Sequence, residues 1–275
     1  MLLLTGVFTF SRCSSGYSEK NGKILFNGRE IKDKNFVVLS EEFAKDATTA
    51  YYKSHPFKYA DVASFTAVDE HYAKDNNKVY YCDEYREGQQ YYLTKRQTIL
   101  EVNGALPGSF VCLKNGFSKD GVHAYFEGNP INVTDVATFV SIDPYFAKDD
   151  VHAYLHGKRI AGSNGKTFEL TNRNYAKDTT HIYYYGFTSD GQHTIAILPC
   201  DKQSFEIIDD RYSKDKSKVF FLGFTLNDAD GPSFSILSSG YAKDKLAVFF
   251  QSRKIAGAEP ETFEVYKETT PLAMM

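Results

Sequence analysis

Seven aspartates recur at one position of a repeated phrase and are the first candidates for chemistry. Each follows an aromatic residue, then Ala or Ser, then Lys; they are Asp46, Asp75, Asp120, Asp149, Asp178, Asp215 and Asp244. Calcium loops place several oxygen ligands at short spacing, whereas this phrase provides one acid per turn. We therefore interpret the carboxylates as acceptors for backbone N–H groups in turns. Replacing Asp178 with Ala is then expected to cost about 1 kcal/mol of stability.

Three histidines share another position of the phrase. His123, His152 and His181 each lie three residues after a motif aspartate, so repeats stacked in register would place them in a row. Such a row resembles a transition-metal site, but other copies carry Thr, Lys or Ala at this position. A structural zinc site needs about four close ligands. No metal and no cofactor are predicted.

The cysteines give no catalytic pattern. Cys13, Cys82, Cys112 and Cys200 show neither a C-x-x-C spacing nor a nucleophile elbow. Cys82 and Cys112 lie about one repeat apart, and whether they form a disulfide is left open by the sequence. No Ser-His-Asp arrangement and no phosphate-binding glycine loop is present, so no catalytic residues are assigned and the chain is predicted not to be an enzyme.

The intervals between the motif aspartates define the repeat. They are 29, 45, 29, 29, 37 and 29 residues. A landmark phenylalanine keeps the same intervals, at Phe36, Phe65, Phe110, Phe139, Phe168, Phe205, Phe234 and Phe263. A degraded copy covers Tyr17 to Phe26. Two landmarks in phase indicate that the whole unit repeats, with an atypical copy at one end.

Each repeat has the composition of short strands and turns. A strand near the landmark Phe, the Lys-Asp turn and a strand ending in two aromatic residues are followed by a recurring Gly suited to a primed hairpin turn, at Gly28, Gly128, Gly157, Gly186 and Gly223. No amphipathic-helix pattern is present. The sequence predicts an all-β tandem array of about eight three-stranded units in an elongated stack. Closure into a β-propeller is the alternative, although 29 residues is short for a four-stranded blade.

The paired aromatic residues should point to opposite faces of their strand. The inward rings are expected to form the core. The outward rings either bind sugars or a partner, or cover a neighbouring strand, and the covering interpretation is favoured.

Two longer intervals locate insertions after the paired aromatics. In repeat proteins such insertions lie on one face, which is often the binding face. The candidate binding residues are therefore Tyr85, Arg86, Tyr91, Tyr92, Asp190 and His193. A merely lengthened hairpin is the equal alternative.

Net charge and the chain ends set further expectations. A net charge of −3 with both signs interspersed argues against nucleic-acid binding. Residues 1–16 are predicted to be a truncated signal or lipoprotein segment, with Cys13 as the lipidation candidate, and the only predicted membrane contact is that anchor. An ordinary first strand of a cytoplasmic protein is the alternative. Residues 17–266 form one continuous repeat domain, and 267–275 are a tail.

The phrase at Lys74–Tyr81, KDNNKVYY, resembles the bacterial DKNYY repeat family, and the likeness extends from Tyr17 to Phe263. The resemblance implies an exported or lipid-anchored protein and supplies no catalytic residues. The Lys-Asp turn is also similar to the aspartate box of sialidase-type propellers, a likeness of fold only. The expected function is a non-enzymatic scaffold that binds a protein or glycan at the cell envelope. A cytoplasmic inhibitor or immunity-type protein is the alternative, and a propeller-type carbohydrate-active enzyme ranks third.

Overall fold

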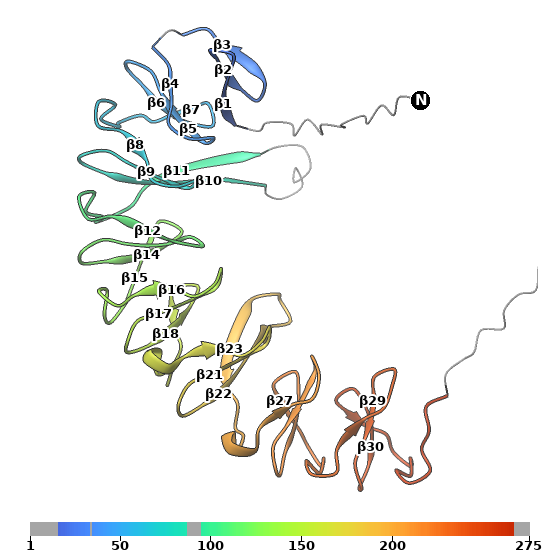
Figure 1. The fold of residues 1–275 in the computed structure, drawn as a ribbon. Helices are drawn as coiled ribbons and strands as arrows, with labels where there is room; N and C mark the ends of the chain where they lie inside the picture. Colours follow the sequence, from blue (N-terminus) through green and yellow to red (C-terminus); the bar gives the residue numbers. More distant parts are fainter. Residues whose placement is uncertain (1–15, 34, 87–94, 267–275) are drawn as a thin grey trace, which may run out of the picture. The chain divides into compact units, whose positions relative to one another are not determined.

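The computed structural model describes residues 16–33, 35–86 and 95–266 of the chain (Figure 1). In these residues the regular structure is β-strand, apart from the short 3-10 helices η2 (Gly165–Thr167) and η3 (Lys202–Ser204). The strands form eight separate antiparallel sheets in chain order, and none closes into a barrel. The predicted all-β tandem array is confirmed. Among the same residues no helix is long and apolar enough to cross a membrane.

The chain forms two compact units, which are described separately. The first contains the described residues up to Asp150 together with Tyr154–Arg159, and the second contains Val151–Ala153 and the described residues from Ile160 onward. The first unit begins with a three-stranded sheet: β1 (Tyr17–Lys20), β2 (Lys23–Phe26) and β3 (Arg29–Ile31). Three four-stranded sheets follow: β4 (Val37–Val38), β5 (Phe43–Lys45), β6 (Ala50–Tyr52) and β7 (His55–Pro56); β8 (Thr66–Ala67), β9 (Tyr72–Lys74), β10 (Val79–Tyr85) and β11 (Arg96–Glu101); β12 (Val111–Lys114), β13 (Phe117–Lys119), β14 (Ala124–Phe126) and β15 (Asn129–Ile131).

The next sheet belongs to the stretch of chain where residues of the two units alternate. It consists of β16 (Val140–Ser141), β17 (Phe146–Lys148), β18 (Ala153–Leu155) and β19 (Lys158–Arg159). The second unit then contains three four-stranded sheets: β20 (Glu169–Leu170), β21 (Tyr175–Lys177), β22 (Ile182–Phe187) and β23 (His193–Ile197); β24 (Glu206–Ile207), β25 (Tyr212–Lys214), β26 (Val219–Phe221) and β27 (Phe224–Leu226); β28 (Ser235–Ile236), β29 (Tyr241–Lys243), β30 (Val248–Phe250) and β31 (Arg253–Lys254).

The structure adds a fourth strand to seven of the eight sheets. A second turn, six residues before the motif aspartate, creates this strand. In the β24–β27 sheet, Asp209 accepts the backbone N–H groups of Arg211 at 2.8 Å and Tyr212 at 2.6 Å. This turn separates the landmark strand β24 from the Tyr212–Lys214 triplet, which therefore forms a strand of its own, β25, before the motif turn at Asp215.

The hydrophobic core is divided into clusters between neighbouring sheets. In the first unit, Tyr80 packs with Phe43 and Tyr52 of the preceding sheet, whereas Tyr81 packs on the opposite face with Tyr125 of the following sheet. Both rings are buried, with 6% and 8% of their surfaces exposed. The β8–β11 sheet has a neighbouring sheet on each of its two faces. Both rings of the aromatic pair therefore cover a neighbouring sheet.

One hairpin turn shows why the recurring residue must be Gly. Glu127 and Gly128 join β14 to β15 with φ angles of 49° and 74°, as a type I′ turn requires. A Cβ atom at position 128 would lie 2.5 Å from Cβ of Tyr81. Position 128 therefore favours Gly for two reasons: its backbone is left-handed, and the Tyr81 side chain of the preceding sheet leaves no room for a Cβ atom.

The predicted turns have positive φ at Gly28, Gly128, Gly157 and Gly223. The turn predicted at Gly186 is wrong. This residue lies inside β22, opposite Thr194 of β23. The insertion extends both strands past the position at which the other hairpins turn.

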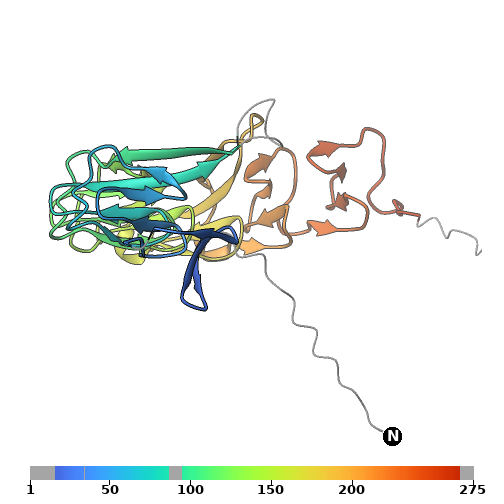
Figure 2. The ribbon, with the colours of Figure 1, turned by 90° about the horizontal axis from the view of Figure 1, so that it is seen from above.

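The two insertions produce the long hairpins of the protein. β10 and β11 contain seven and six residues, and β22 and β23 contain six and five. The corresponding strands β6 and β7 contain only three and two. Figure 1 shows β10 and β11 continuing past β6 and β7, and in Figure 2 they form the long teal pair.

Candidate binding site

The motif aspartates hold the turns on which the hairpins are built. Asp178 is 3% exposed, and one carboxylate oxygen accepts the backbone N–H groups of Thr180 at 2.8 Å and His181 at 2.7 Å. The other oxygen accepts the N–H of Asn164 at 2.8 Å and the O–H of Tyr183 at 2.7 Å. Burial alone would raise the pKa of Asp178, but the hydrogen bonds from Tyr183, Asn164, His181 and Thr180 outweigh it and lower this pKa. The charged carboxylate is thus an acceptor within the fold.

The same contacts recur along the chain. N–H groups two and three residues later bind the carboxylates of Asp46, Asp75, Asp120, Asp215 and Asp244. The N–H fourteen residues earlier binds those of Asp75, Asp120, Asp149, Asp215 and Asp244. A tyrosine O–H five residues later binds Asp46, Asp75, Asp120 and Asp149. The last two repeats have Phe220 and Phe249 instead.

Two further motif residues have roles that the sequence analysis missed. The motif lysine reaches into the next repeat: Lys45 Nζ lies 2.8 Å from the carbonyl oxygen of Val62 and 3.0 Å from that of Phe65. The Ser or Thr before the landmark Phe accepts a backbone N–H of the motif turn. For example, Ser64 Oγ accepts the N–H of Asn76 at 3.0 Å. A Ser or Thr precedes every landmark from Phe65 to Phe263, so this second signal was present in the sequence.

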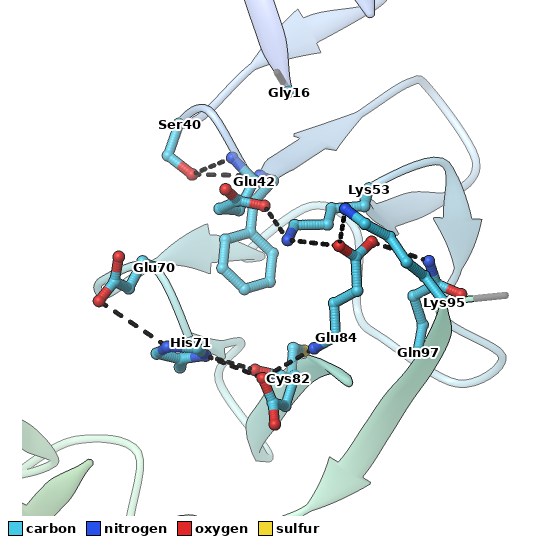
Figure 3. Close-up of polar contacts among 12 residues, drawn as sticks. Gly16, Ser40, Glu42, Lys53, Glu70, His71, Cys82, Glu84, Lys95 and Gln97 are labelled. Carbon is cyan, nitrogen blue, oxygen red and sulfur yellow. Dashed lines mark hydrogen bonds and ion pairs between the residues drawn. The ribbon is translucent and has the colours of Figure 1, made fainter. Parts of the chain in front are cut away.

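A charged cluster joins the short β6–β7 hairpin to the long β10–β11 hairpin (Figure 3). Lys53 Nζ lies 3.1 Å from Glu42 Oε2 and 3.8 Å from Glu84 Oε1. Glu84 also accepts hydrogen bonds from Lys95 Nζ and, at 3.0 Å, from Gln97 Nε2. Burial alone would raise the pKa of Glu84, but the contacts with Lys95, Lys53 and Gln97 lower it. The cluster therefore fixes the long hairpin against its neighbour with Glu84 charged at neutral pH.

A groove of about 550 Å³ lies beside this cluster, within the first unit. One wall is the segment from His55 to Tyr59; the other is formed by Lys78, Tyr80, Gln97, Ile99 and Glu101. Tyr59 is 82% exposed, and Lys78 Nζ lies 2.6 Å from Glu101 Oε2. The groove thus combines an exposed ring with polar and charged groups, the composition of a recognition site for a peptide or a sugar. The sequence analysis did not select its residues.

Of the predicted site residues in the first insertion, Tyr85 and Arg86 lie at the end of β10. Tyr85 is 39% exposed and pairs with Arg96 of β11. Tyr91, Tyr92 and Cys13 lie outside the described residues. The segment after the first insertion therefore lines the groove through Gln97, Ile99 and Glu101 of β11, and neither Tyr85 nor Arg86 is among the lining residues.

Asp190 and His193 belong to the β22–β23 hairpin of the second unit. Asp190 accepts a hydrogen bond from the Thr188 hydroxyl, which lowers the pKa of this exposed carboxyl. His193 Nδ1 is in close contact with the Tyr185 hydroxyl, and its ring centroid lies 4.5 Å from that of Phe187. Phe187 is 64% exposed. The two predicted residues thus share a hairpin with an exposed aromatic ring.

The remaining candidate residues have structural surroundings. His123 Nδ1 lies 3.7 Å from Asp120 Oδ1, and His181 Nδ1 lies 3.9 Å from Asp178 Oδ1. His152 Nδ1 lies 3.4 Å from the carbonyl oxygen of Ser163. The part of the chain that the structure describes contains no group of three or more potential metal ligands.

Three cysteines are described, and all are free thiols: Cys82, Cys112 and Cys200. The first two therefore do not form the disulfide that the sequence left open. Burial raises the pKa of the Cys82 thiol, and burial followed by the charge of Asp69 raises that of Cys112. Burial, with the charge of Asp215, raises the pKa of Cys200 to about 11. These thiols are poor nucleophiles at neutral pH.

Small antiparallel sheets in tandem, seven of them carrying the same aspartate turn, define a β-repeat protein. Comparison with known families agrees with this architecture. The DKNYY family model matches residues 4–84, 85–223 and 185–253, and the chain belongs to the DKNYY family. No curated protein and no solved structure matches it.

Proposed function

We propose that the chain is a non-enzymatic β-repeat scaffold that recognises a protein or a glycan at the bacterial cell envelope, with the groove beside β11 as its binding site. The observation that carries the proposal is the combination of an open groove of about 550 Å³ with a tyrosine that is 82% exposed at its wall. An exposed aromatic ring beside polar groups can stack on a sugar or anchor a partner side chain.

The surroundings of the groove favour binding over catalysis. Its carboxylate, Glu101, is paired with Lys78, and the nearby Glu84 is held by two lysines and Gln97. The motif aspartates accept hydrogen bonds in turns, which supports a structural role for these carboxylates.

Two tyrosines allow a controlled test. Tyr59 and Tyr266 are 82% and 89% exposed, but only Tyr59 lines the groove. We expect Tyr59→Ala to lose binding on a glycan array or a displayed peptide library, and Tyr266→Ala to bind like the unaltered chain. Equal binding by all three proteins, or no binding to either library, would contradict the proposal.

The envelope location is tested separately, by the intact mass of the N-terminus in fractionated host cells. A diacylated or triacylated Cys13 in the membrane fraction is the expected result. An unprocessed chain in the cytoplasm would contradict export and favour the inhibitor alternative.

A further inference from the structure

The edge strand β11 differs in length from most edges of the protein. In the seven four-stranded sheets, the last strand along the chain is one of the two edges. Five of these edges contain two or three residues, namely β7, β15, β19, β27 and β31. β11 contains six and β23 contains five. Proteins keep free edges short because an open edge pairs readily with another strand.

The outer edge of β11 presents three residues with open backbone groups. The N–H of Val102 donates to the carbonyl oxygen of Val79 at 2.8 Å, and among the described strands β11 pairs with β10 alone. Backbone direction alternates along a strand, so the N–H and C=O groups of Gln97, Ile99 and Glu101 point away from β10. No backbone hydrogen bond links these outward groups to other residues in the described part of the chain.

The same three residues line the groove. Gln97, Ile99 and Glu101 form one wall, and the segment from Phe57 to Tyr59 lies across from them. The charged residues of the lining are Lys58, Lys78 and Glu101, an excess of one positive charge. The open edge of β11 therefore borders a groove that can hold the side chains of a ligand. The excess positive charge of this groove favours a ligand with an acidic residue.

We propose that an extended segment of a partner protein adds to β11 as an antiparallel or parallel strand, with alternate apolar side chains in the groove and an acidic residue near Lys58. This inference rests on the proposed function and names its ligand class. Six residues of β11 would pair with about 20 Å of extended peptide. Main-chain hydrogen bonds supply affinity in such strand addition, and the alternate side-chain contacts supply specificity.

β23 has an edge of similar length, but it lacks the charged side chains that β11 carries at Arg96 and Glu101. Its sequence His193–Ile197 carries no Lys, Arg, Asp or Glu, and no residue of β23 lines the groove of about 540 Å³ in the second unit. At β11 a long strand edge and the lining of a groove coincide, and for this reason we place the added strand there.

Proline provides a direct test. Ile99→Pro removes one outward N–H without breaking a hydrogen bond to β10, whereas Ile99→Ala removes most of the side chain and keeps the N–H. The full-length chain is used to select ligands from a phage-displayed library of random dodecapeptides, and a selected peptide is synthesised for titration. We expect peptides with alternating apolar residues and an acid, and roughly tenfold weaker binding by Ile99→Pro than by Ile99→Ala.

Further variants keep the outcome interpretable. Gln97→Pro against Gln97→Ala repeats the comparison if Ile99→Pro lowers the melting temperature, and Tyr59→Ala reports on the groove alone. Equal binding by the Pro and Ala variants would overturn strand addition, and a continued effect of Tyr59→Ala would preserve the proposed function. Failure of selection, glycan binding only, or a dimer that Ile99→Pro abolishes would also overturn the inference.

Discussion

Replacing Asp178 with Ala tests whether the motif aspartate is a structural acceptor. The carboxylate is 3% exposed and accepts the backbone N–H groups of Asn164, Thr180 and His181 as well as the Tyr183 hydroxyl. Alanine leaves these donors without their acceptor. A buried donor left unpaired costs roughly 1–3 kcal/mol.

The magnitude follows from which donors water can reach. Thr180 and Asn164 are exposed, so their N–H groups can bind water in the variant, whereas Tyr183 is fully buried. We count the buried Tyr183 hydroxyl in full and expect a loss of about 2 kcal/mol. This exceeds the value of about 1 kcal/mol expected from the sequence, because a helix cap satisfies fewer donors.

Hydrogen exchange followed by mass spectrometry measures this loss locally, which suits a repeat protein whose parts can open separately. The amides of Asn164, Thr180 and His181 should exchange roughly thirtyfold faster in Asp178→Ala. Asp190→Ala, a change of an exposed acid in the same unit, is the matched control. Equal exchange in the two variants would refute the role assigned to Asp178.

The same variant should change the response to acid. Asp178 has a folded-state pKa below its usual value, so protonation favours the unfolded chain. Its contribution to stability is therefore complete above about pH 4 and is lost as pH falls below that value. In urea titrations at several pH values, Asp178→Ala should lose stability less steeply below about pH 4 than the unaltered chain. Parallel pH profiles would contradict this expectation.

Three further changes test other parts of the repeat. Tyr183→Phe should cost about 1 kcal/mol in urea denaturation because it removes one hydrogen bond to a buried carboxylate, and an unchanged midpoint would argue against that bond. Gly128→Ala should lower the melting temperature of the protein more than Gly104→Ala does. Both positions have positive φ, but only a Cβ atom at position 128 would clash with Tyr81. Equal losses would show that the clash relaxes. Maleimide at neutral pH should leave Cys82 unlabelled in the folded chain because this thiol is buried, and rapid labelling would exclude the described packing.

The repeat and its turns could be predicted because their signals are side chains at fixed spacing. Asp178 accepts N–H groups at a fixed spacing, and Gly128 stands where a positive φ and a neighbouring ring favour Gly. The second turn at Asp209 was missed because an acid in a variable segment is indistinguishable from an ordinary surface residue until its N–H donors are seen. The reach of Lys45 was missed for a related reason: its partners are backbone carbonyls, which no residue type marks.

The groove could not be predicted from the sequence. It arises because β11 is longer than the neighbouring β7, and the insertion pattern indicated the length without indicating which side would remain open. The selected residues Tyr85 and Arg86 lie at the C-terminal end of β10, whereas the groove is lined by residues of β11. Tyr59 is outside both insertions and carried no sequence signal.

The lysine contact between repeats has a consequence for how genes of this kind change in length. Lys45 and Lys119 each bind carbonyl oxygens 17, 18 and 20 residues further along the chain. Unequal recombination that removes or duplicates 29 codons in phase recreates this contact at the new junction. A crossover displaced by one codon does not, because the lysine then faces the wrong part of the backbone. Selection for folding therefore favours variation by whole repeats.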